Sequence, residues 1–116
     1  MISLKEAVLL AINSLEDKKG EDIKVIDIHE ISTIGDYFII ASGGSLPQVH
    51  AMANAVDEAL GRQGVMPKST EGYQNGNWIL MDYGDFIIHI FDKENRPYYD
   101  LERIWKDGKE VDPHTL

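Results

Sequence analysis

The chain has 116 residues, 43% of them hydrophobic, and a formal net charge of -9. This length suits one compact domain spanning 1–116 and leaves too little chain for a second hydrophobic core. Because the sequence contains no cysteine, disulfides, thiolate metal sites and thiol nucleophiles are excluded. The excess of carboxylates argues against general binding to nucleic-acid phosphates, which requires Lys and Arg to displace counterions. It fits either a basic protein partner or solubility alone.

No segment approaches the roughly 20 apolar residues that a membrane-spanning helix needs. The first residues also lack the basic region and apolar run of a signal peptide. We therefore expect a cytoplasmic protein with no membrane partner.

The first predicted element is an amphipathic helix that begins after Ser3. Ser3 and Glu6 have the spacing of a capping box, and apolar residues recur at helical spacing over 4–15. Two strands are predicted next, at 23–28 and 36–41. The second is apolar on both faces, which indicates a strand inside the sheet rather than at its edge.

A second amphipathic helix is predicted after the junction Gly43-Gly44-Ser45, with Ser45 as its N-cap and an end near Gly64. Its predicted buried stripe consists of Leu46, Val49, Ala53, Val56 and Leu60. A strand, two glycines and a helix N-terminus could surround a phosphate with N–H groups. Since neither a Walker lysine nor a Gly-x-Gly-x-x-Gly spacing follows, a plain turn is the favoured interpretation.

The last part of the sheet is predicted as a short strand near 65–68 and an antiparallel hairpin of 77–82 and 86–91. Alternation along the second hairpin strand gives two apolar faces. One face carries Phe86, Ile88 and Ile90, and the other carries Ile87, His89 and Phe91. The helices should cover one face, and the other is either covered too or presented to a partner.

Several motifs in this order resemble the Iojap-related ribosomal silencing factor family, also described as an oligomerisation-domain family. The motifs are Asp36-Tyr37-Phe38-Ile39-Ile40, Glu71-Gly72, Trp78, Leu80 to Asp82, His89-Ile90-Phe91, Arg96, Tyr99, Leu101-Glu102 and Trp105. The resemblance implies an α/β fold similar to the nucleotidyltransferases but without their activity, with a mixed sheet of about five strands packed with helices. It also implies binding to the large ribosomal subunit through that subunit's fourteenth protein. This would block association with the small subunit and repress translation under nutrient limitation. A homodimer off the ribosome is a further implication.

With this resemblance, nine residues are predicted to bind the partner: Trp78, Leu80, Asp82, His89, Phe91, Arg96, Tyr99, Glu102 and Trp105. Alternative roles remain open for several of them. Trp78 could cap the core instead of anchoring an interface, and His89 could be a hydrogen-bonded core residue. Tyr99 and Trp105, with Tyr98 and Leu101, could pin a final helix to the sheet. The tail 106–116 is expected to fray.

We predict no catalytic residue, no metal site and no cofactor. Nucleotidyltransferases hold two metal ions with carboxylates separated by one residue on a strand. Here Asp57 and Glu58 are adjacent in a predicted helix, and Asp82 and Asp85 flank a turn and should diverge. Two alternatives remain: a nucleotide-binding or nucleotidyl-transferring enzyme that uses Gly43 to Ser45, and an oligomerising adaptor unrelated to ribosomes.

Overall fold

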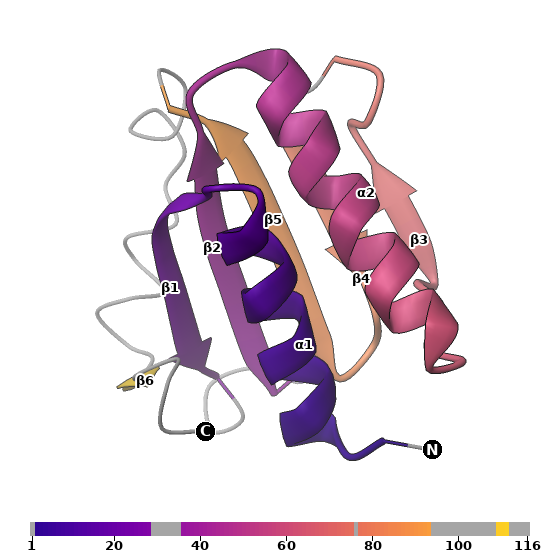
Figure 1. Ribbon diagram of the computed structural model, residues 1–116. Helices are drawn as coiled ribbons and strands as arrows, with labels where there is room; N and C mark the ends of the chain where they lie inside the picture. Colours follow the sequence, from indigo (N-terminus) through magenta and orange to yellow (C-terminus); the bar gives the residue numbers. More distant parts are fainter. Residues whose placement is uncertain (1, 29–35, 76, 94–108, 112–116) are drawn as a thin grey trace.

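The computed structural model of the protein describes residues 2–28, 36–75, 77–93 and 109–111 (Figure 1). The elements follow in the order α1 Leu4–Asp17, β1 Glu21–Asp27, β2 Tyr37–Gly43, α2 Leu46–Arg62, β3 Ser69–Glu71, β4 Trp78–Asp82, β5 Phe86–Asp92 and β6 Lys109–Val111. Both helices lie side by side on one face of the sheet. The described part is therefore a two-layer α/β structure, as the sequence predicted.

The sheet is mixed, and its strand order is β3-β4-β5-β2-β1-β6. β2 and β5 run parallel in the middle, while the other neighbours pair antiparallel. β2 lies between β1 and β5, so the prediction that this apolar strand is internal is confirmed. The five predicted strands correspond to β1–β5, with shifted bounds.

The ends of the sheet differ from the predictions. The strand expected near 65–68 forms instead at 69–71, because Val65 is still hydrogen-bonded to the end of α2 and Pro67 has no N–H for a ladder. Lys109–Val111 pair with β1 as β6, so the prediction of a frayed tail at 106–116 is wrong for these three residues. The rest of that tail lies outside the described residues.

Local sequence signals account for both helix starts. The Ser3 hydroxyl accepts a hydrogen bond from the Glu6 N–H at 3.2 Å, and the reciprocal bond completes the predicted capping box. Ser45 caps α2 in the same way, accepting from the Gln48 N–H at 3.2 Å. Leu46, predicted as buried, is 42% exposed, because burial along α2 begins only at Val49.

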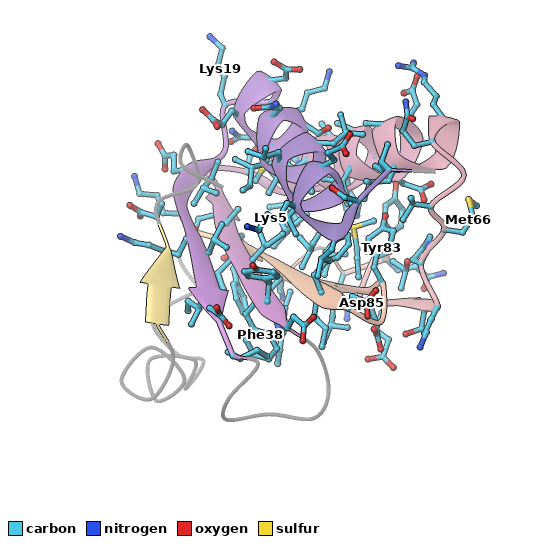
Figure 2. All side chains as sticks on the ribbon, turned by 90° about the horizontal axis from the view of Figure 1, so that it is seen from below. Lys5, Lys19, Phe38, Met66, Tyr83 and Asp85 are labelled. Atoms are coloured by element: carbon cyan, nitrogen blue, oxygen red, sulfur yellow. The ribbon has the colours of Figure 1, made fainter. Side chains whose placement is uncertain are left out.

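The sheet has a buried apolar cluster on each face. The helix-side cluster joins α1 and α2 to alternate strand residues such as Ile39, Met81 and Ile88. The opposite-face cluster consists of Ile26, Ile28, Phe38, Ile40, Ile87 and Phe91, with Trp78 and Leu80 packed at its margin. In Figure 2, Phe38 lies on the side of the sheet away from the helices, whereas Tyr83 lies on the helix side. The predicted division of the β5 residues between two faces is confirmed.

Candidate functional site

The predicted binding residues of the hairpin share one face of the sheet. In the β4–β5 ladder, Trp78 is opposite Phe91, Leu80 opposite His89, and Asp82 opposite Ile87. Directly opposed residues of antiparallel strands point to the same side. Since the intervening Ile79 and Met81 belong to the helix-side cluster, these residues lie on the opposite face.

Trp78 is half-buried at the margin of the opposite-face cluster. Its indole Nε1–H donates a hydrogen bond to Nδ1 of His89 at 3.0 Å. Its ring centroid lies 5.3 Å from that of Phe91 and 5.8 Å from that of His89. One part of the side chain therefore caps the core and another is accessible, so both roles predicted for this residue are compatible with its position.

His89 and Phe91 are buried beneath this margin. His89 is 4% exposed and Phe91 is fully buried. Burial lowers the pKa of His89 to about 4, so the imidazole is neutral near pH 7. Neither side chain offers the free surface that the predicted direct contact with a partner needs, because both are occupied in supporting Trp78.

Two carboxylates lie on the same face as Trp78 and Leu80. Asp82 is half-buried, and its carboxylate accepts a hydrogen bond from the Gly84 N–H at 2.8 Å. Glu71 is exposed on the neighbouring edge strand, directly opposite Leu80. Leu80 thus has two carboxylates as neighbours on this face, with Trp78 beside it at the other end of β4, and we call Glu71, Trp78, Leu80 and Asp82 the Trp78 surface.

Gly72 fixes the approach of the β3–β4 loop to this surface. Its φ of +77° belongs to the left-handed region, and a Cβ added there would lie 2.0 Å from the backbone oxygen of Trp78. Only glycine allows so close a passage. In the sequence, Glu71-Gly72 was notable only as a family motif, since no local pattern shows that Gly72 touches Trp78.

Four of the predicted binding residues, Arg96, Tyr99, Glu102 and Trp105, lie outside the described residues, as do Tyr98 and Leu101. Their assignment to an interface or to a final helix stays a prediction.

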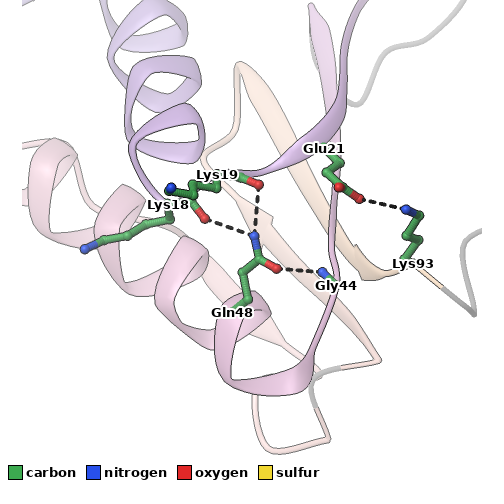
Figure 3. Close-up of polar contacts among 6 residues, drawn as sticks. All are labelled: Lys18, Lys19, Glu21, Gly44, Gln48 and Lys93. Atoms are coloured by element: carbon green, nitrogen blue, oxygen red, sulfur yellow. Dashed lines mark hydrogen bonds and ion pairs between the residues drawn. The ribbon is translucent and has the colours of Figure 1, made fainter.

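The junction at Gly43 to Ser45, where a phosphate site was the alternative to a plain turn, is occupied by a glutamine side chain (Figure 3). Gln48 Oε1 accepts a hydrogen bond from the Gly44 N–H at 2.7 Å. Its Nε2 donates to the backbone oxygens of Lys18 and Lys19 at 3.0 and 2.9 Å. Gln48 therefore links the end of α1 to the start of α2 and engages an N–H that a phosphate would need. This contact, between residues about thirty positions apart, could not be found from local sequence.

Gly43 has a packing role at the same junction. A Cβ there would lie 2.9 Å from Cγ2 of Val49, so glycine lets the strand end approach the first turn of α2. The arrangement favours the plain turn over the phosphate loop.

Elsewhere in the described part of the chain, no group of three or more His, Asp or Glu side chains is placed to hold a metal ion. No described helix is long and apolar enough to cross a membrane.

Comparison with known proteins assigns the chain to a family. A family profile described as ribosomal silencing factor during starvation matches residues 2–116. The chain belongs to this family. A ribosomal silencing factor from Halalkalibacterium halodurans is 39% identical over 111 residues, which cover 96% of this chain and 95% of the relative.

More distant relatives and solved structures agree with the assignment. The crystal structure of a Chromobacterium violaceum protein is 37% identical and matches with a TM-score of 0.87, over 96% of this chain and 92% of that one. A mouse protein named mitochondrial assembly of ribosomal large subunit protein 1 is 29% identical over 107 residues, 90% of this chain but 47% of the mouse protein. The similarity to ribosomal silencing factors thus covers nearly the whole chain.

Proposed function

We propose that this chain is a ribosomal silencing factor that binds the large ribosomal subunit, blocks its association with the small subunit and so represses translation when nutrients are limited. Membership of the family supports the ribosomal role. The structural observation that supports the binding proposal is the Trp78 surface. Tryptophan is among the residues that contribute most to binding at protein interfaces. Here Trp78 is half-buried and packs against the buried ring of Phe91.

The charge of this surface suggests the chemistry of the partner. Glu71 and Asp82 border the apolar centre, and the whole chain carries a net charge of -9. Such a surface is complementary to a basic protein and would be repelled by exposed phosphates. We therefore propose contact with a ribosomal protein, the fourteenth of the large subunit, rather than with ribosomal RNA. This partner is consistent with the cytoplasmic location expected from the sequence.

Two finer features belong to the same proposal. The mixed sheet with helices on one face is compatible with the expected likeness to nucleotidyltransferases, and we propose that the chain keeps such a fold without catalysis. The bonds that engage Gln48 and Gly44 support this, because they fill the junction that an enzyme would use for phosphate. We also propose that the chain forms a homodimer away from the ribosome.

Co-sedimentation with separated ribosomal subunits tests the function. The purified chain should travel with large subunits and not with small ones, and adding it before the subunits are mixed should reduce the joined peak. A chain that stays at the top of the gradient, with subunit joining unchanged, would refute the proposal. A rise in melting temperature on adding nucleotide and Mg²⁺ would instead favour the enzyme alternative.

A further inference from the structure

We infer that His89 is the positioning residue of the Trp78 surface: its Nδ1 accepts the indole N–H and thereby fixes the orientation in which Trp78 meets the large subunit. The inference rests on the proposed function for its binding consequence. Its structural part, the control of the Trp78 side chain by His89, can be tested without ribosomes.

The ladder register explains why this contact orients the indole. Trp78 is directly opposite Phe91, and His89 is opposite Leu80, so Trp78 and His89 are diagonal neighbours across the hairpin. Diagonal pairs are far enough apart that only long or aromatic side chains can bridge them. The indole therefore leans along the hairpin toward His89, and its plane is tilted by 33° to the imidazole and by 31° to the Phe91 ring.

The hydrogen bond also determines the tautomer of the imidazole. An indole N–H can only donate, so Nδ1 of His89 must be the acceptor and Nε2 must carry the hydrogen. Nε2 is buried and has no hydrogen-bond partner among the residues that the structure describes. The surroundings are apolar, with the Phe38 ring centroid 4.9 Å away.

If stability were the sole constraint, histidine would be an unfavourable residue at position 89. A buried N–H that lacks a partner loses its bonds to water without replacement. Phenylalanine would fill much of the same space beside Phe38 and Phe91 and bring no orphan donor. A purely structural role thus predicts that phenylalanine is tolerated at position 89, whereas a positioning role predicts that it folds but loses control of Trp78.

Three substitutions separate these roles. In His89→Asn the amide oxygen can occupy the place of Nδ1, whereas in His89→Gln the amide reaches toward the place of Nε2; His89→Phe has no acceptor. We expect His89→Phe and His89→Gln to weaken binding to large subunits by about fivefold, the effect of losing one hydrogen bond. His89→Asn should stay within about twofold of the wild type. Unchanged or tighter binding by His89→Phe would overturn the inference.

A nuclear magnetic resonance measurement of the free protein tests the orientation directly. The chain has two tryptophans, so a Trp78→Phe variant identifies the indole ¹⁵N–¹H signal of Trp78. That signal should exchange slowly with solvent in the wild type and in His89→Asn, and rapidly in His89→Phe and His89→Gln. If all four exchange alike, His89 does not position Trp78, even where binding to large subunits is normal.

The two measurements distinguish the two proposals. A wild-type chain that does not bind large subunits refutes the function, while the exchange rates still decide the role of His89. If His89→Phe does not fold, the pair His89→Asn and His89→Gln carries the test, because both variants have an amide and differ in where it lies.

Discussion

The two faces of the sheet are built from the same strands but have different chemistry. Phe86, Ile88 and Ile90 of β5 belong to the helix-side cluster. Aliphatic side chains of α1 and α2 cover this cluster. The β5 residues between these three enter a face that combines isoleucines with aromatic rings, a buried histidine and a half-buried tryptophan. The comparison indicates a division of roles, in which one face stabilises the fold and the other positions a binding surface.

The largest expected effect comes from the helix-side face. Ile88 is fully buried there, and Ile88→Ala should reduce the free energy of unfolding by about 2–5 kcal/mol because it leaves a cavity. Denaturant titration measures this change. The fraction that remains folded should bind large subunits with unchanged affinity; a specific loss of affinity would contradict the division of roles between the faces.

The next largest effect concerns pH and the opposite face. The pKa of His89 is about 4 in the folded chain and about 6.5 when exposed, so the unfolded chain binds an additional proton between these values. The contribution of His89 to the free energy of unfolding should therefore be fully present above pH 6.5 and decrease by about 3 kcal/mol as the pH falls toward 4. Denaturant titrations at several pH values measure this slope.

The matched control is His89→Phe, in which this contribution to the slope is absent. The difference between wild type and variant isolates His89 from the carboxylates and the other histidines. An identical pH dependence in both chains would show that His89 can be protonated without cost, and therefore that it is not held as a neutral acceptor.

The Trp78 surface itself is tested by the double variant Trp78→Ala, Asp82→Ala. It removes the proposed anchor and one rim carboxylate, so we expect a loss of at least about 30-fold in affinity for large subunits, typical of an interface hot spot. The chain should remain folded, as circular dichroism can verify. Met66→Ala is the control, because Met66 is 66% exposed and lies outside the Trp78 surface. Normal binding by the double variant would show that the site is elsewhere.

The smallest effect is expected at the helix junction. Gln48→Ala removes the side-chain bonds to Gly44, Lys18 and Lys19, all of them solvent-exposed, and should lower stability by about 1 kcal/mol. Thermal unfolding measures it, with Gln63→Ala at the other end of α2 as control. Binding to large subunits should not change. If Gln48→Ala gained nucleotide binding, the phosphate interpretation of this junction would have to be reconsidered.

Much of the fold was predictable because its signals are local. The capping box at Ser3, the N-cap at Ser45 and the alternation along β5 each depend on residues within one or two turns or on one strand. The apolar character of β2 on both faces correctly indicated an internal strand. The candidate surface was predictable only in part: Trp78, Leu80 and Asp82 lie together, but Glu71 was predicted only as part of a motif.

The sequence by itself determined where both helices and the strands β1, β2, β4 and β5 form, which faces of β5 are apolar and to which family the chain is similar, because these depend on neighbouring residues and on the order of motifs. Only the tertiary structure decided that β6 completes the sheet beside β1, that Gln48 fills the helix junction and that His89 is buried as the acceptor for Trp78. Each of these contacts joins distant or diagonally placed residues, whose meeting depends on strand register and helix packing rather than on local pattern.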